Sequence, residues 1–461
     1  MTDRIDTLII LGAGGDLTSR LLLPGLASLL ASSRGDAVTV LGVDRAEITD
    51  AAWQQKVSVA FATTPSPLGT TVAEKSRYLR GDATDADDLR RVLGEAQGRI
   101  ALYFALPPAV TILVVKALAK IDLPKGIVFA LEKPFGTDLA SARALNRRLE
   151  TLVPEEQVFR VDHFLGKSTV LNLLGLRFAN RIFEPLLSAP NVEKVEITFD
   201  EQLALEGRAG YYDKAGALTD MIQSHLLLVL ALTTMEPPAS VDADDLRGGM
   251  AQVLRATRAW EKDGTSSHRA HYTAGEIDGR TLPAYTAEEG VDPARGTETL
   301  AEVTLAIDNW RWAGVPFVLR SGKALGGAKQ EVVVTLKDVP HLPKGLHGQS
   351  GPTQLRISMK PATLELDLRI NGEDDPFVLE KVVLASDMRS GELNAYGEVL
   401  AGLLDGDPTL SVRGDVAEEC WRIIAPFVRA WSDGAVPLDG YPAGSSGPSS
   451  WHRRTKVISA E

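Results

Sequence analysis

An N-terminal α/β domain followed by an α+β domain is the fold class that the sequence predicts, on three observations. The chain has 461 residues, about three times the ~150 residues of a usual domain. Over the first 160 residues, short apolar runs alternate with stretches of helical pattern. After residue 180, apolar and polar residues alternate at a period of two, which is typical of antiparallel strands with one face in water. We therefore expect domains over residues 1–160 and 161–461.

The first domain should contain a parallel sheet with crossover helices, in a doubly wound, Rossmann-like arrangement. Its expected strands are apolar and rich in β-branched residues, as strands buried on both faces are. They are TLIIL (7–11), AVTVLGV (37–43), ALYFAL (101–106), GIVFAL (126–131) and QVFRV (157–161). The second domain should contain the alternating strands VEKVEITFD (192–200), AEVTLAID (301–308), EVVVTL (331–336), QLRISM (354–359) and ATLELDLRI (362–370), with helices over 216–232 and 391–405.

Composition excludes several classes of protein. The chain carries 61 acidic and 49 basic residues, a net charge of −12 without a charged block, so we expect no nucleic-acid partner. The single cysteine, Cys420, cannot form an internal disulfide, which indicates a reducing compartment. The N-terminus has no signal-peptide pattern, and no apolar run approaches the ~20 residues that span a bilayer. We therefore expect a cytoplasmic protein that does not enter a membrane.

A glycine-rich turn joins the first strand to a helix in the segment LIILGAGGDLTSRLLLPGL. Glycines there let the backbone approach a pyrophosphate, which the N–H groups at the helix start can bind. Gly12, Gly14 and Gly15 fit this role, but Leu17 occupies the last glycine position of the G-x-G-x-x-G fingerprint. Alone, the turn is a weak signal, because a tight turn without a ligand uses glycine in the same way.

Asp44 and Arg45 follow the second strand, where the ribose of an adenosine would lie. A carboxylate suits a free 2′-hydroxyl, and a guanidinium suits a 2′-phosphate. The pair therefore leaves NAD and NADP both open, and a solvated pair at the head of a helix is the structural alternative.

Two further motifs place polar residues after buried strands. EKPFG puts Lys133 at the carboxyl end of a strand, where open α/β sheets bind ligands, and the following proline sets its backbone extended unless the bond is cis. RVDHFLGK puts Asp162 and His163 at the end of the next strand, and Gly166 and Lys167 at a helix start, a combination that suits a phosphate. A solvated lysine in a turn and a surface Asp–His pair are the alternatives.

His225 lies in the apolar helical run GALTDMIQSHLLLVLAL, five residues beyond Asp220. A lone histidine in such a run is more often a core residue than a functional one. The functional interpretation rests on the number of independent candidates that one reaction would use together.

Together these motifs resemble those of the glucose-6-phosphate dehydrogenase family. The match runs in order from the glycine turn through EKPFG, RVDHFLGK, EGRAGYYD, DMIQSH and LRSGKAL to YPAGSSGP, and so covers essentially the whole chain. EKPFG and RVDHFLGK are its specific signatures. The resemblance implies a dinucleotide-binding domain joined to an α+β domain with a large, mostly antiparallel sheet, through which subunits usually dimerise. It implies oxidation of C1 of glucose 6-phosphate to the lactone, with hydride transfer to NADP or NAD, as the first step of an oxidative pentose phosphate route.

The resemblance also implies roles for single residues. His225 corresponds to the general base that takes the C1 hydroxyl proton, and Asp162 to the carboxylate that orients this base. His163 and Lys167 match phosphate ligands, and no metal is required, since hydride transfer from an alcohol needs a base and an aligned acceptor. The other expected substrate ligands are Lys133, which also bridges to the coenzyme, Glu201, Asp220, Lys323 and Lys329, and the coenzyme positions are Gly12, Gly14, Gly15, Asp16, Leu17, Asp44, Arg45 and Lys133.

The sequence departs from the family pattern at four places. Leu21 stands where a basic residue often follows the glycine turn, and Phe164 stands where the phosphate loop has a tyrosine. Ser168 replaces the glutamate after Lys167, and Ala328 replaces a basic residue, with Lys329 next to it. These changes bear on substrate affinity and coenzyme choice more than on the chemistry.

Two other functions stay open at this point. Another sugar oxidoreductase with an EKP lysine as its acid/base would need neither His225 nor the RVDHFLGK motif. A non-catalytic paralogue that binds nucleotide or sugar phosphate would tolerate the loss of His225 or Asp162, and both are present. The expected partners are a sugar phosphate and further copies of the chain, in a homodimer or homotetramer.

Overall fold

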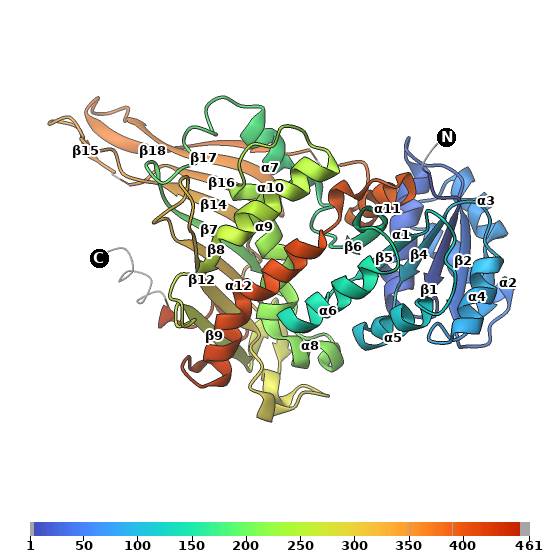
Figure 1. The fold of residues 1–461 in the computed structure, drawn as a ribbon. Helices are drawn as coiled ribbons and strands as arrows, with labels where there is room; N and C mark the ends of the chain where they lie inside the picture. Colours follow the sequence, from blue (N-terminus) through green and yellow to red (C-terminus); the bar gives the residue numbers. More distant parts are fainter. Residues whose placement is uncertain (1–3, 350, 390, 452–461) are drawn as a thin grey trace. The chain divides into compact units, whose positions relative to one another are not determined.

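The computed structural model describes residues 4–349, 351–389 and 391–451, which form two compact units (Figure 1). Unit 1 comprises Met1–Leu171, Glu236–Ala251 and Gly391–Trp421. Unit 2 comprises Asn172–Met235, Gln252–Ser390 and Arg422–Glu461. Each unit is therefore built from segments that lie far apart in the sequence.

Unit 1 contains a six-stranded parallel sheet in the order β3-β2-β1-β4-β5-β6. This order confirms the predicted Rossmann-like fold. All residues of β1 and β4 are buried, as expected for strands covered on both faces. The strand β3 was not predicted, because RYLR has no apolar run. The strands are β1 (Thr7–Leu11), β2 (Thr39–Asp44), β3 (Arg77–Arg80), β4 (Ile100–Phe104), β5 (Val128–Glu132) and β6 (Val158–Val161).

Helices connect the strands of unit 1, and side-chain caps at Thr49, Ser66, Asp85 and Asp138 begin four of them. The apolar cluster around the sheet also contains residues of α11, so the C-terminal segment completes this core. The helical segments are η1 (Thr18–Leu22), α1 (Leu23–Ala31), α2 (Asp50–Phe61), α3 (Pro67–Lys75), α4 (Ala86–Gly94), α5 (Pro108–Leu118), α6 (Leu139–Glu150), η2 (Glu155–Gln157), α11 (Ala395–Asp405) and η6 (Pro408–Leu410). The helices α10 (Ala243–Ala256) and α12 (Gly414–Ser432) begin in unit 1 and end in unit 2.

Unit 2 contains an 11-stranded sheet, which is mostly antiparallel, as predicted. The pairs β7–β13, β9–β19 and β15–β18 are parallel exceptions. Its strands are β7 (Val192–Asp200), β8 (Thr257–Ala259), β9 (Ser267–Thr273), β12 (Leu300–Ile307), β13 (Phe317–Gly322), β14 (Gln330–Leu336), β15 (His347–Gly348), β16 (Gln354–Met359), β17 (Ala362–Asn371), β18 (Val378–Asp387) and β19 (Leu438–Pro442), and a separate hairpin pairs β10 (Gly275–Ile277) with β11 (Arg280–Leu282).

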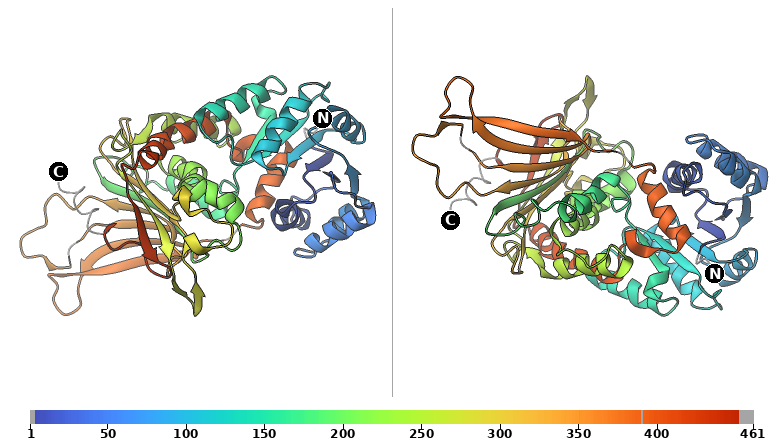
Figure 2. Two further views of the ribbon diagram at one scale, coloured as in Figure 1. Left: turned by 90° about the horizontal axis from the view of Figure 1, so that it is seen from below. Right: turned by 90° about the horizontal axis from the view of Figure 1, so that it is seen from above.

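One face of this sheet is covered by a run of helix formed by α8 (Ala209–Ala217), η3 (Leu218–Leu226) and α9 (Leu227–Thr234) (Figure 2). The segment η3 contacts β7, β12 and β13. The remaining helical segments of this unit are α7 (Ser168–Phe178), which begins at the end of unit 1, η4 (Tyr285–Ala287) and η5 (Pro293–Arg295).

Among the described residues, the run Ala209–Thr234 is long and apolar enough to cross a membrane by length and composition. This corrects the expectation that no apolar run approaches that length. In the protein, 83% of its most apolar window is buried, as in the core helix of a globular domain.

Candidate active site

The glycine turn of unit 1 brings the backbone of three neighbouring elements together. Gly12 has a φ of +86°, and a Cβ atom there would lie 2.2 Å from the carbonyl oxygen of Ala105, so only glycine fits. The Gly12 N–H donates to the carbonyl of Val43 over 2.9 Å, which ties the turn to the end of β2. Gly14 and Gly15 are exposed just before η1, as a backbone that receives a pyrophosphate must be.

Asp44 faces this turn. Its Oδ2 atom accepts a hydrogen bond from the Gly14 N–H over 2.9 Å, and its Oδ1 atom accepts one from the Arg45 N–H over 2.7 Å. The Arg45 side chain is exposed. The ammonium of Lys56 on α2 donates to the Ala13 carbonyl over 2.8 Å, and burial lowers the pKa of this lysine against the opposing effect of Asp44. The carboxylate therefore lies at the turn itself, where a ribose hydroxyl would bind.

The other predicted coenzyme residues of the turn differ in burial. Asp16 is exposed, whereas Leu17 is partly buried against the apolar cluster of the sheet. At the position where the fingerprint has its last glycine, the Leu17 side chain thus packs against the core. Position 21 in η1 is 43% exposed, but because it is leucine it supplies no positive charge there.

The EKPFG motif follows β5, and its Lys133–Pro134 bond is cis. Pro134, Phe135 and Gly136 line a small, mostly apolar recess of about 140 Å³, together with Glu132 and the start of α5. Lys133 is partly exposed beside it. The recess lies at the carboxyl ends of the parallel strands, where this class of sheet binds ligands.

Glu132 accepts a very short hydrogen bond from the hydroxyl of Tyr103 on β4, and a longer one, 3.4 Å, from the hydroxyl of Tyr396 on α11. Burial raises the pKa of Glu132 to about 7, against the lowering effect of these hydroxyls and of Lys133. Glu132 is the first residue of the EKPFG motif, and its functional contacts were not predictable from the motif because Tyr103 and Tyr396 lie far from it in the sequence.

The RVDHFLGK motif forms a turn after β6 that exposes His163 partly and buries Asp162. The Asp162 Oδ1 atom accepts from the Phe164 N–H over 2.9 Å. The Lys167 ammonium lies 3.6 Å from the centre of the Phe164 ring, a cation–π contact. Phe164 lacks the hydroxyl of the family tyrosine, but its ring holds the lysine in place.

A second ring holds the predicted phosphate ligand His163. Tyr396 stacks on it, with ring centroids 5.8 Å apart and an interplanar angle of 14°. This contact depends on Gly166, since a Cβ atom there would lie 2.2 Å from the carbonyl oxygen of Ala395. Tyr396 is about 230 positions from His163 in the sequence, so no local pattern could have revealed it.

Unit 2 carries Asp220 and His225 on η3, a segment of π-helix. Such segments are rare and occur often at functional sites. His225 is buried and Asp220 is partly exposed. Burial raises the pKa of the Tyr211 hydroxyl. The carboxylate of Asp220, which accepts a hydrogen bond from this hydroxyl, raises it further.

Glu201 and Lys323 come together because β7 and β13 are parallel neighbours whose carboxyl ends share one edge of the sheet. Their Oε2 and Nζ atoms lie 2.6 Å apart. The Lys323 ammonium also lies 5.2 Å from the centre of the Tyr212 ring. The structure thus assembles a carboxylate, an ammonium and an aromatic ring, a set that can bind the hydroxyls and face of a sugar.

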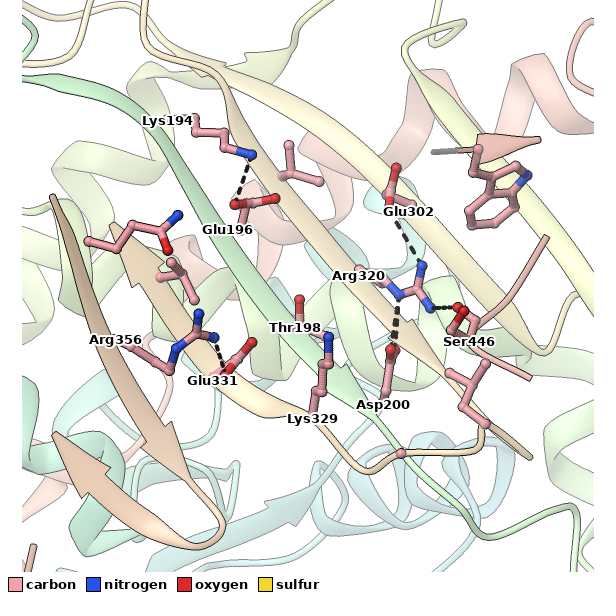
Figure 3. Close-up of a pocket in the computed structure, with 16 residues that line it drawn as sticks. Lys194, Glu196, Thr198, Asp200, Glu302, Arg320, Lys329, Glu331, Arg356 and Ser446 are labelled. Carbon is pink, nitrogen blue, oxygen red and sulfur yellow. Dashed lines mark hydrogen bonds and ion pairs between the residues drawn. The ribbon is translucent and has the colours of Figure 1, made fainter. Parts of the chain in front are cut away.

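Lys329 does not join this group. Ala328 lines the recess of about 560 Å³ that contains Glu201, whereas Lys329 lines a different recess of about 470 Å³ with Asp200 and Arg320 (Figure 3). The neighbouring lysine therefore does not line the recess in which a basic side chain at position 328 would lie. Its role as a substrate ligand stays a prediction, which the separate recess does not favour.

The recess of Lys329 lies on the polar face of the sheet, where ion pairs cover the strands (Figure 3). Arg320 pairs with Asp200 over 3.0 Å, and Arg356 pairs with Glu331 over 2.6 Å. Burial raises the pKa of Asp200 to about 6 against the opposing charge of Arg320.

The fold and these residues define a dinucleotide-dependent oxidoreductase: a Rossmann-like sheet with a glycine turn and a lysine at a strand end, and a second unit with polar ligands. The comparisons with known proteins agree. Residues 9–172 match the family of the glucose-6-phosphate dehydrogenase NAD binding domain, and residues 174–457 match that of the glucose-6-phosphate dehydrogenase C-terminal domain.

Curated relatives match over nearly their full length. Glucose-6-phosphate 1-dehydrogenase of Gluconobacter oxydans is 37% identical over 95% of this chain and 94% of its own, and that of Treponema pallidum is 35% identical over 96% and 92%. The crystal structure of the enzyme from Mycobacterium avium superposes with a TM-score of 0.84 at 34% identity, over 97% of this chain and 96% of its own. A glucose-6-phosphate dehydrogenase in complex with its substrate glucose-6-phosphate has a TM-score of 0.88 at 26% identity, over 100% and 99%.

The chain belongs to the glucose-6-phosphate dehydrogenase family. It is therefore an oxidoreductase that uses a nicotinamide coenzyme. The match over nearly the whole chain favours this family's enzyme over both alternatives, another sugar oxidoreductase with an EKP lysine and a non-catalytic paralogue.

Proposed function

We propose that this protein oxidises C1 of D-glucose 6-phosphate to 6-phospho-D-glucono-1,5-lactone, the first step of an oxidative pentose phosphate route. One observation carries this proposal: the chain matches relatives named glucose-6-phosphate 1-dehydrogenase over nearly its whole length. The presence of His225, Asp162 and the phosphate-loop residues His163 and Lys167 supports it, since each has a role in one reaction.

In this proposal His225 is the general base. A neutral imidazole has a pKa suited to taking the C1 hydroxyl proton as hydride leaves. Asp162 orients that imidazole and stabilises the imidazolium that forms. The nicotinamide coenzyme, when bound, supplies the hydride acceptor.

The remaining residues bind the two reactants. His163 and Lys167 hold the phosphate dianion by charge-assisted contacts. The Glu201–Lys323 pair and Asp220 bind sugar hydroxyls, and Lys133 lies between sugar and coenzyme. The proposal assigns residues 1–160 chiefly to the coenzyme and residues 161–461 chiefly to the substrate and to contacts between subunits.

For the coenzyme we propose that NADP is used with only modest discrimination against NAD. The glycine turn suits a pyrophosphate, because Gly14 and Gly15 are exposed just before η1. Gly12 is required by the close approach of the Ala105 carbonyl, which shapes the turn itself. The exposed guanidinium of Arg45 suits a 2′-phosphate, whereas Asp44 at the turn repels one.

We also propose that the protein is a homodimer or homotetramer and that it acts in the cytoplasm. The partner surface is the open face of the large sheet, by analogy with the family. Analytical ultracentrifugation of the purified protein tests the oligomeric state.

A coupled absorbance assay at 340 nm tests the function. Purified protein is mixed with glucose 6-phosphate and either NADP or NAD, with glucose and galactose 6-phosphate as comparison substrates. Reduction of coenzyme that depends on glucose 6-phosphate supports the proposal. Turnover of another sugar phosphate at a higher kcat/KM would contradict the substrate assignment.

A further inference from the structure

A short segment, Thr297-Glu298-Thr299, lies immediately before β12 and contacts the start of the helix that carries Asp220 and His225. Glu298 is only 7% exposed. Its Oε1 atom accepts a hydrogen bond from the Leu218 N–H over 3.0 Å, and its carbonyl accepts one from the Ala217 N–H over 3.2 Å. Both N–H groups belong to the helix start, where no partner within the helix is available.

The backbone before Leu218 is shaped to this carboxylate. Gly216 has a φ of +65°, and a Cβ atom there would lie 2.2 Å from the Oε1 atom of Glu298. The Thr297 hydroxyl donates to the carbonyl of Asp213 over 2.7 Å, one turn earlier. The two side chains thus fix the break between α8 and η3 from both sides.

The π-helical form of η3 matters for Asp220 and His225, which are five residues apart. In an α-helix, residues five apart lie about 140° from each other around the axis. Where hydrogen bonds run from residue i to i+5, residue i+5 lies roughly one turn above residue i, on the same side. The wider turn therefore brings these two side chains to one side of the helix.

The same segment is connected to the sugar ligand Lys323. The carbonyl of Thr299 accepts from the Lys323 N–H over 2.9 Å. The hydroxyl of Tyr441 lies 2.8 Å from the Thr299 hydroxyl and donates to the Lys323 carbonyl over 2.6 Å. Residues 297–299 thus contact both the backbone of Lys323 and the start of the helix that carries Asp220 and His225.

We propose that Glu298 is a positioning residue for the reaction: its carboxylate fixes the start and register of η3, so that Asp220 and His225 lie on the same side and at a set height relative to Lys323. It touches neither substrate nor coenzyme. The inference rests on the roles proposed above for Asp220 and His225.

The alternative is that the negative charge of Glu298 changes the pKa values of the groups in the site. Burial raises the pKa of Glu298 to about 7, against the lowering effect of the Leu218 N–H. The charged and titratable groups that interact with it among the described residues are Arg269 on β9, Tyr212 on α8 and Tyr285 on η4. Position and charge are separable by substitution.

Two variants separate them. Glu298→Gln keeps the length of the side chain and an oxygen that accepts from Leu218, but removes the charge. Glu298→Asp keeps the charge but withdraws the oxygens by one methylene. If Glu298 acts by position, Glu298→Asp lowers kcat/KM for glucose 6-phosphate about tenfold or more, because small displacements of reacting groups are costly. Glu298→Gln then stays within about threefold of the wild type.

The control is Glu288→Gln, the same change at a carboxylate that accepts from the Tyr272 hydroxyl over 2.9 Å and not from η3. We expect wild-type kinetics from it. All variants are assayed well below their thermal midpoints, and kcat, KM and the pH profile are recorded.

Three outcomes would overturn the proposal. Wild-type kcat and KM in Glu298→Asp, with only a lower thermal midpoint, would mean a merely structural role. The reverse order, with Glu298→Gln impaired and Glu298→Asp active, would mean that charge decides. Equal loss of kcat/KM in both variants would also exclude the proposal that the length of the Glu298 side chain positions η3. Failure of the proposed function is distinct, because the wild type itself would then not turn over glucose 6-phosphate.

Discussion

The two units place their candidate ligands by different means. In unit 1 the polar residues lie at the ends of parallel strands: Asp44 is the last residue of β2, Lys133 follows β5, and Asp162 and His163 follow β6. The topology alone brings them to one edge of the sheet. In unit 2 Asp220 and His225 lie on a π-helical segment. A hydrogen bond that Glu298 accepts from Leu218 and one that Thr297 donates to Asp213 fix where this segment begins.

This difference indicates which substitutions each unit tolerates. A site at strand ends is held by the ladder of the sheet, so single side-chain changes there alter affinity or specificity. A site on an irregular helix depends on a few specific contacts, so changes there alter geometry and rate. The predictions below test that contrast.

The largest effect is expected at the helix of unit 2. His225→Asn is close in shape but cannot accept the proton, and we expect kcat to fall by about 10² to 10⁴ with little change in substrate affinity. Steady-state kinetics with glucose 6-phosphate measures both constants. A rise in KM alone would make His225 a binding residue.

A smaller effect is expected at the turn after β6. Lys167→Ala removes a charge-assisted contact to the phosphate, and we expect KM for glucose 6-phosphate to rise about 10- to 100-fold. Turnover of free glucose, which has no phosphate, should change much less. Equal losses for both sugars would remove Lys167 from the phosphate site.

A still smaller effect is expected at the glycine turn. Asp44→Ser removes a negative charge that faces the turn, as the 2.9 Å contact with the Gly14 N–H shows. The repulsion of a 2′-phosphate is worth on the order of 1 kcal/mol, so the ratio of kcat/KM for NADP to that for NAD should rise about fivefold. An unchanged ratio would mean that the carboxylate lies outside the ribose pocket, and a wild type that rejects NADP would exclude the role of Arg45.

The smallest effect concerns the stability of unit 1. The pKa of Glu132 is raised to about 7, above its ordinary value, so the folded state binds this proton more tightly than the unfolded chain does. Its contribution to stability is full below about pH 4.5 and declines as pH rises through 7. We expect the thermal midpoint of the wild type to fall between pH 5 and 8 by about 1 to 3 °C more than that of Glu132→Gln. Scanning calorimetry at both pH values measures this difference, and parallel declines would contradict the assignment.

The sequence predicted the parallel sheet well, because strands buried on both faces are continuous apolar runs. It missed β3, whose RYLR has only one fully buried side chain. In unit 2 it predicted the strands from their alternation but placed one helix over 216–232, where the structure has a break at Gly216, a π-helical segment and then α9. Composition does not distinguish i→i+4 from i→i+5 hydrogen bonding, since both follow from the same apolar pattern.

The sequence by itself determined the class of fold, because strands buried on both faces and alternating strands are local patterns. Local patterns also predicted the coenzyme turn, whereas the resemblance to the family suggested the roles of the candidate ligands. Only the tertiary structure decided which distant side chains support them. Tyr396 reaches His163, and Glu298 reaches Leu218, through packing of segments that are far apart in the chain. It also decided that Lys329 faces away from Glu201, because the direction of a side chain depends on the backbone around it and not on its neighbour in the sequence.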